Sequence, residues 1–163
     1  MERERLRLDR TVYRHEMEAQ AYGSTFVSLW DRLRSTEPFK VLRQFPFVRL
    51  EYRLPTEWKP LPLGMAGIRQ AMLNGKPISL DNPGYLAKLK ELEDAGWKII
   101  QTEWHHSEFR PDKNGRAPQS VISFEIHSTK ANAQQRCIIK GQLEVTWTLH
   151  KTNSGLRIPG TIK

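Results

Sequence analysis

Alternating apolar and polar residues dominate the last third of the chain, in three runs separated by two turn-rich breaks. Successive side chains on a strand point to opposite faces, so each run predicts a strand, and their order predicts an antiparallel meander. The last run is the most regular, and its apolar face carries Cys137 and Trp147. The runs cover residues 97–110, 121–129 and 136–150.

The first run differs from the other two because neither of its faces is purely apolar. Strict alternation assigns one face to Trp97, Ile99, Gln101, Glu103, His105, Ser107 and Phe109. The other face receives Trp104 and His106, so the two adjacent histidines point in opposite directions. Such a mixture is typical of a curved strand with one side in a cavity.

Two amphipathic helices are predicted upstream of the meander. Residues 9–35 carry apolar side chains at helical spacing, Gly23 and Ser24 could split this helix, and Pro38 closes the region. The second helix has Asp81 or Asn82 as its cap and ends near Gly96, where a left-handed residue is favoured.

The remaining segments give weaker patterns. Residues 41–54 predict one strand, with Leu50 and Tyr52 on a shared face, and the prolines that follow predict an irregular connection. Residues 65–73 predict a short helix. The tail from Thr152 could end in an interrupted strand at Ile162.

The element order predicts an α+β fold in one domain, residues 1–163, with a C-terminal end that could be truncated. We expect a curved antiparallel sheet, made of the meander and one earlier strand, packed on the N-terminal and central helices as a cone or roll. This order resembles the cystatin-like roll and, within it, the nuclear transport factor-like cone of ketosteroid isomerases and polyketide cyclases.

A second resemblance rests on particular residues. The segments that carry it are Leu8-Asp9-Arg10-Thr11-Val12-Tyr13, residues 25–34, Phe45-Pro46-Phe47, Glu103-Trp104-His105-His106 and residues 141–147. They look like the N-terminal accessory domain of bacterial, planctomycete-type proteins that continue into FG-GAP (VCBS) repeats and an ASPIC/UnbV module. The resemblance implies a domain beside a repeat scaffold and assigns no chemistry to it.

The chain is basic, with a formal charge of +8 and a pI near 9.8, so nucleic acid is a legitimate partner hypothesis. The N-terminal arginines are, however, interleaved with acidic residues, which favours an ordinary basic surface. The tryptophans could stack on bases, but most lie at positions suited to a core.

Cys137 is the only cysteine, so the chain can form no intramolecular disulfide, and its place on an apolar face favours a buried structural thiol. No apolar run reaches membrane-spanning length, and the first fifteen residues carry many charges. These features predict a cytoplasmic protein without a membrane partner, provided that Met1 is the true start.

The candidate chemistry lies on the first two strands of the meander. Glu103 and His105 share a face, so they are the candidate acid/base pair, while Trp104, Glu125 and His127 are candidate ligand-binding residues. No metal or other cofactor is predicted, since the ligand spacings of zinc sites are absent. A solvated wet face is the competing interpretation of both Glu and His pairs.

The leading functional hypothesis is a non-catalytic binding or accessory domain of unknown ligand. It could pair with itself through the polar face that carries Lys140, Gln142, Glu144 and Thr146. The first alternative is a small isomerase, lyase or cyclase-like enzyme, which requires Glu103 or His105 at the base of an apolar pocket. The second is nucleic-acid binding through the basic surface.

Overall fold

The computed structural model describes residues 2–61, 67–130, 132 and 134–163, and in the first helix it describes side chains from Arg10 onward. The described helices are α1 (Glu2–Leu33), α2 (Pro38–Arg43) and α3 (Asn82–Asp94). The described strands are β1 (Arg49–Arg53), β2 (Lys59–Pro60), β3 (Arg69–Gln70), β4 (Pro77–Leu80), β5 (Trp97–Arg110), β6 (Gln119–Lys130), β7 (Gln135–Lys151) and β8 (Arg157–Ile162). The α+β class is therefore confirmed.

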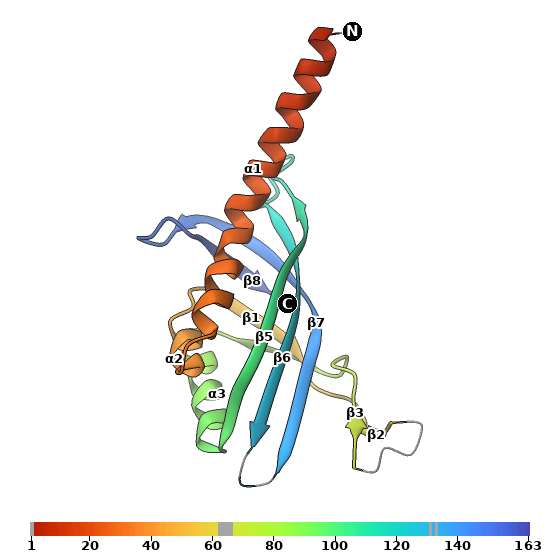
Figure 1. The fold of residues 1–163 in the computed structure, drawn as a ribbon, viewed down its shortest axis with the longest axis vertical. Helices are drawn as coiled ribbons and strands as arrows, with labels where there is room; N and C mark the ends of the chain where they lie inside the picture. The colour runs from red at the N-terminus through yellow and green to blue at the C-terminus, as the bar shows by residue number, and fades with distance from the viewer. Residues whose placement is uncertain (1, 62–66, 131, 133) are drawn as a thin grey trace.

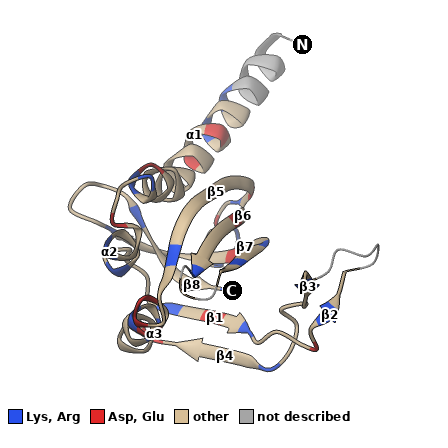
Figure 2. Cartoon of the chain, turned by 60° about the horizontal axis from the view of Figure 1, so that its bottom comes forward, with Lys and Arg blue, Asp and Glu red and all other residues tan. Residues whose placement is uncertain are grey.

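Six of these strands form one mixed sheet in the order β4-β1-β8-β7-β6-β5. Its pairs are antiparallel except β1 with β8, where Leu50 lies opposite Ile162 in parallel register. The sheet is strongly curved, so that β5, β6 and β7 arch over β1 and β4 (Figure 2). The predicted meander is confirmed, and β8 extends it to a fourth strand.

Helix α1 crosses the inner face of the sheet and projects well beyond it at its N-terminal end (Figure 1). It continues unbroken through Gly23 and Ser24, so the predicted split does not occur. Its second half buries Tyr22, Phe26, Leu29 and Leu33. Thr25 fixes the helix to β8, because its hydroxyl donates to the Arg157 carbonyl at 2.8 Å.

Helix α3 begins and ends where the sequence predicts. Asp81 is the N-cap, and its Oδ1 accepts a hydrogen bond of 2.9 Å from the Gly84 N–H. Gly96 has a φ of 85°, the left-handed conformation that glycine adopts without a steric penalty. This turn leads the chain directly into β5.

Two predictions upstream of α3 need correction. Residues 41–43 belong to helix α2, because Pro38 at its first turn starts a helix there and the strand begins only at Arg49. The predicted helix at residues 65–73 is wrong, since Arg69 and Gln70 form β3 in a hairpin with β2. Met65 lies outside the described residues. The strand β4 was not predicted.

Strand β5 contains two register irregularities against β6, one between Ile99 and Gln101 and one between His106 and Glu108. Each extra residue reverses the alternation of side chains, as a β-bulge does. The strand therefore turns Trp97 and Ile99, then Trp104, and then Phe109 toward the helices. The face predicted for these residues is wrong: Glu103 and His105 do not share it with Trp97, Ile99 and Phe109.

The core lies between α1, α2 and the inner face of the sheet. Its buried members are Tyr22, Phe26, Leu29, Leu33, Val41, Phe45, Phe47, Trp104, Ile122, Val145, Trp147 and Ile162. Trp147 is 2% exposed, as its position on the apolar face of the last run predicts. None of the described helices is long and apolar enough to cross a membrane.

Candidate hydrophobic cavity

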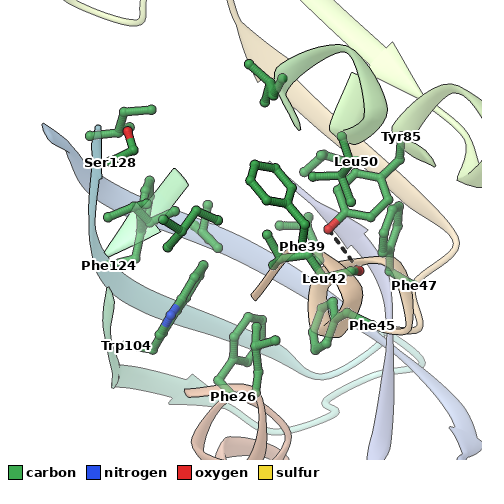
Figure 3. Close-up of a pocket in the computed structure, with 18 of the residues that line it drawn as sticks. Phe26, Phe39, Leu42, Phe45, Phe47, Leu50, Tyr85, Trp104, Phe124 and Ser128 are labelled. Atoms are coloured by element: carbon green, nitrogen blue, oxygen red, sulfur yellow. Dashed lines mark hydrogen bonds between the residues drawn. The ribbon is translucent and has the colours of Figure 1, made fainter. Parts of the chain in front are cut away.

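A cavity of about 440 Å³ lies between the inner face of the sheet and the three helices. Trp104 and Phe124 lie on one side of it, with Phe39, Leu42 and Tyr85 on the other (Figure 3). The lining residues are Phe26, Leu29, Phe39, Leu42, Phe45, Phe47, Leu50, Tyr85, Leu89, Leu92, Trp97, Ile99, Trp104, Phe124, Ile126, Ser128, Cys137, Ile139, Leu143 and Ile162. Its volume is within the range of small-molecule sites.

The wall of the cavity is almost entirely apolar, and among the described residues that line it none carries a charge. Its hydroxyl groups are already engaged. Tyr85 donates to the Leu42 carbonyl at 3.1 Å, and Ser128 donates to the Cys137 carbonyl at 3.3 Å. The cavity therefore suits an apolar occupant.

Burial keeps the ionisable groups of the wall neutral. It raises the pKa of Tyr85 well above its ordinary value. It also raises the pKa of the Cys137 thiol, because a thiolate beside apolar side chains loses its hydration. Cys137 faces the cavity among apolar side chains, but it is half-buried, whereas the alternation of its strand predicts a buried thiol.

The lining residues of the cavity differ in exposure. Phe26 and Trp104 are among the buried ones, at 2% and 7% exposed. The rings of Phe26 and Trp104 stack with their centroids 6.0 Å apart. The ring of Phe124 also stacks on Trp104, with a centroid distance of 5.6 Å. Ile139 on β7 is 39% exposed and belongs to the open side.

The candidate acid/base pair lies on the outer face of β5, away from the cavity. Glu103 Oε2 is 3.8 Å from His105 Nε2, and their side chains are 49% and 60% exposed. Neither residue lines the cavity. The rings of His105 and of Trp30 from α1 pack in a T-shaped arrangement, with centroids 5.2 Å apart. The structure therefore brings Glu103 and His105 together, but on a face of the sheet that is exposed to solvent.

The second Glu and His pair lies on the same outer face, one strand further in. Glu125 Oε1 is 2.5 Å from His127 Nε2, and Glu125 lies directly opposite Glu103 across the β5 and β6 pair. Lys140 of β7 lies opposite Glu125 on the other side. Trp104, by contrast, points inward and lines the cavity, so the five candidate residues divide between two faces of the sheet.

His106 belongs to a buried hydrogen-bond network that the sequence did not reveal. Ser120 Oγ accepts a hydrogen bond of 2.8 Å from Trp147 Nε1 and lies 2.9 Å from His106 Nε2. Burial lowers the pKa of His106, and a backbone hydrogen bond with Glu108 opposes this in part. The network ties β5, β6 and β7 together on the inner face.

Within the described ranges, no three His, Cys, Asp or Glu side chains come together as a metal site requires. No protein-family model matches the chain. A search of curated proteins likewise finds no significant relative.

Several charged side chains on and beside α2 and α3 form pairs of opposite sign. Figure 2 shows blue and red segments on the same helices. Lys40 pairs with Glu37 at 3.0 Å, Lys90 pairs with Asp94 at 2.6 Å, and Arg43 of α2 pairs with Glu93 of α3. This local pairing reduces the positive field available to a polyanion.

The sequence prediction missed most of the cavity wall. Phe39, Leu42, Phe45 and Phe47 come from α2 and the loop after it. The last three lie in the segment predicted as a strand, residues 41–54, and Phe39 lies just before it. The available signal was its aromatic density, because Phe39, Phe45 and Phe47 occur within nine positions.

Proposed function

We propose that this protein is a non-catalytic binding module that holds an apolar small molecule in the cavity between its sheet and its helices. The observation that carries the proposal is a cavity of about 440 Å³ whose lining residues are without charge. Protein interiors otherwise contain few voids larger than a water molecule. Bulkier side chains could easily fill an apolar cavity of this size. That the sequence leaves the cavity open favours a bound molecule as its occupant.

The alternative of a small acid/base enzyme receives less support. It required Glu103 or His105 at the base of an apolar pocket, and both side chains lie on the outer face in solvent. A general acid or base must reach the substrate proton directly or through one water molecule. The pair Glu125 and His127 faces the same outer side as Glu103.

Nucleic-acid binding through the basic surface is the other alternative. The net charge of +8 supports this alternative. The local ion pairs on α2 and α3 weaken it. It predicts an affinity that falls steeply as salt rises. Retention on heparin no stronger than that of charge-matched controls would count against it.

The strand order supports the finer fold hypothesis as well. A long first helix, a hairpin of β1 and β4, and the parallel insertion of β8 beside β1 agree with a nuclear transport factor-like, cystatin-like roll. In such a roll the space between helices and sheet is the natural place for a ligand. The kinship with accessory domains of FG-GAP (VCBS) proteins stays a prediction.

Self-association through the outer face of the sheet is the second part of the proposal. Lys140 and Glu144 alternate there with Gln142 and Thr146, and Ile138 on the same face is 59% exposed. A two-fold contact would place opposite charges of two copies within reach. Sedimentation of the unaltered protein and of Lys140→Glu tests this self-association. The hypothesis is contradicted if the unaltered protein stays a monomer at high concentration, or if it forms a dimer that Lys140→Glu leaves unchanged.

The binding proposal is tested with N-phenyl-1-naphthylamine, a neutral apolar dye whose fluorescence rises in a dry environment. We expect saturable binding at one site per chain. Ile139→Arg places a cation at the open side of the cavity, where dye binding must desolvate it, so affinity should fall by about tenfold or more.

The matched control is the adjacent Ile138→Arg, which adds the same charge on the opposite face of β7. It should leave dye affinity within twofold of the unaltered protein. Absence of saturable binding up to the solubility limit of the dye, or an equal loss in both variants, would refute the proposal.

A further inference from the structure

The chain between β1 and β4 forms a narrow projection, which we call the basic arm. It consists of residues 53–61 and 67–77. Lys59 lies opposite Gln70, and the Thr56 N–H donates to the Met72 carbonyl at 2.9 Å, so the two halves of the arm run side by side. The arm projects on the side away from α2 and α3 (Figure 1, Figure 2). None of its described residues lines the cavity.

The basic arm exposes several large apolar side chains. Trp58 is 52% exposed and Met72 is 70% exposed, and the pairing of β2 with β3 places Trp58 beside the strand that leads to Met72. The exposed apolar residues of the arm are Leu54, Trp58, Ile68, Met72 and Leu73. Single exposed apolar residues are ordinary, whereas a group of them on one projection is typical of an interaction surface.

The same arm carries positive charge that no neighbour neutralises. Its cations are Arg53, Lys59, Arg69 and Lys76, and its one anion is Glu57. None of these cations forms an ion pair with any residue that the structure describes. On α2 and α3, by contrast, lysine and arginine side chains pair with carboxylates. Unpaired positive charge and exposed apolar surface therefore coincide in the arm.

A surface that is both basic and apolar fits an anionic lipid bilayer. Tryptophan rings are favoured at the level of the lipid headgroups, and lysine and arginine keep their charged ends in water while their methylene chains cover apolar surface. Each cation near an anionic leaflet adds electrostatic attraction. Single-stranded nucleic acid fits less well, because its bases stack on aromatic rings and Trp58 is the one aromatic residue among the exposed apolar side chains described in the arm.

We propose that the basic arm docks the protein on the surface of a bilayer that contains anionic phospholipid. Trp58 and Met72 enter the interface, and Lys59 and Arg69 contact the lipid phosphates. The expectation of no membrane partner rested on the lack of a spanning run, which an interfacial contact does not need. This inference rests on the arm alone and goes beyond the binding function proposed for the cavity.

Co-sedimentation with vesicles tests the docking. We expect vesicles of phosphatidylglycerol and phosphatidylcholine in equal amounts to bind the protein about tenfold or more tightly than vesicles of phosphatidylcholine alone. Lys59→Glu replaces an attraction by a repulsion and should weaken binding to the anionic vesicles by about tenfold. Met72→Ser removes an apolar side chain from the interface and should weaken it by about fivefold.

Each variant has a matched control outside the arm. Lys113→Glu makes the same change of charge at an exposed position between β5 and β6. Leu149→Ser removes an apolar side chain of β7 that is 80% exposed. Both controls should bind the anionic vesicles within about twofold of the unaltered protein, because a general attraction of a basic protein would not distinguish them from the arm variants.

A second measurement reports the position of the arm directly. In a Cys137→Ser background, a nitrobenzoxadiazole label is attached to Met72→Cys or, as the control, to Leu149→Cys. On anionic vesicles, we expect the label at position 72 to shift its emission to shorter wavelength and to be quenched by brominated lipids. The label at position 149 should show neither change.

The docking proposal is wrong if anionic vesicles do not bind the protein, if arm and control variants lose binding equally, or if the label at position 72 stays in water. Binding of a single-stranded oligothymidylate that Lys59→Glu abolishes, without vesicle binding, would assign the arm to nucleic acid instead. A dimer that Met72→Ser dissociates, again without vesicle binding, would assign it to a second copy of the chain. Dye binding in the cavity is measured separately, so the two proposals can fail independently.

Discussion

Gly23 of α1 lies directly against the imidazole ring of His106 on β5, and a Cβ at Gly23 would stand 2.5 Å from His106 Nδ1. Alanine normally stabilises a helix interior relative to glycine by about 1 kcal/mol. Here the ring cannot yield freely, because its Nε2 is 2.9 Å from Ser120 Oγ. We expect Gly23→Ala to lower the free energy of unfolding by about 1–3 kcal/mol, measured in urea.

The clash has a direct control in the double variant. His106→Ala removes the ring that the new methyl group would meet, so Gly23→Ala should become neutral or stabilising in that background. If the two substitutions are additive, the close approach of α1 to β5 does not determine the effect, and the prediction fails.

Ser120 is expected to be the most sensitive small polar residue of the sheet. Its Oγ accepts from Trp147 Nε1 and contacts His106 Nε2, and it is 3% exposed. Ser120→Ala leaves the buried indole without its acceptor, which should cost about 1–3 kcal/mol of unfolding free energy. Ser123→Ala removes the exposed contact with Ser107 and should change stability by less than about 0.5 kcal/mol.

Stability should depend on pH through His106. Burial lowers its pKa in the folded state, so the unfolded state binds a proton first as pH falls below the ordinary histidine range near 6.5. The stabilisation is complete above that value and is lost as pH falls toward the folded pKa. Urea unfolding between pH 7.5 and 5 should show this loss.

His106→Gln should flatten the pH dependence over that interval, while His105→Asn on the exposed face should preserve it. A pH profile that is identical in the unaltered protein and in His106→Gln would contradict the assignment of the dependence to this residue.

Cys137 offers a single-site reporter for the cavity, because it is the only cysteine of the chain. Burial raises the pKa of its thiol, so less thiolate is present at neutral pH. We expect alkylation by iodoacetamide at pH 7.5 to be several-fold slower than that of free cysteine, and slower again with a saturating apolar dye. Alkylation at an unhindered rate, unaffected by dye, contradicts a half-buried, cavity-facing thiol.

The meander was predictable because period-two alternation persists over long runs, and the cap at Asp81 and the turn at Gly96 were predictable from local chemistry. The faces of β5 were not. A bulge adds one residue without leaving a compositional mark, and the register shifts near Ile100 and Ser107 reverse which side chains face inward. Glu103 and His105 were therefore predicted correctly to share a face of β5. They were predicted wrongly to share it with the residues that face the cavity.

The cavity could not be predicted for a different reason. Its walls come from segments far apart in the chain, and Phe45 and Tyr85 are within reach of Phe124 only after the sheet has curved. Aromatic residues at such positions predict a filled core, because sequence patterns report that side chains are buried and not how completely they fill the space. The vacant volume is a property of the tertiary arrangement alone.

The parallel insertion of β8 between β1 and β7 also has a kinetic consequence. Among the described strands, the hairpin of β1 and β4 pairs with the rest of the sheet through β8, and most of the chain separates Leu50 from its partner Ile162. Contacts so distant in sequence form late, since a long loop must close first. Leu50 and Ile162 both belong to the cavity wall. We therefore expect the apolar cavity to be completed late in folding, when β8 pairs with β1.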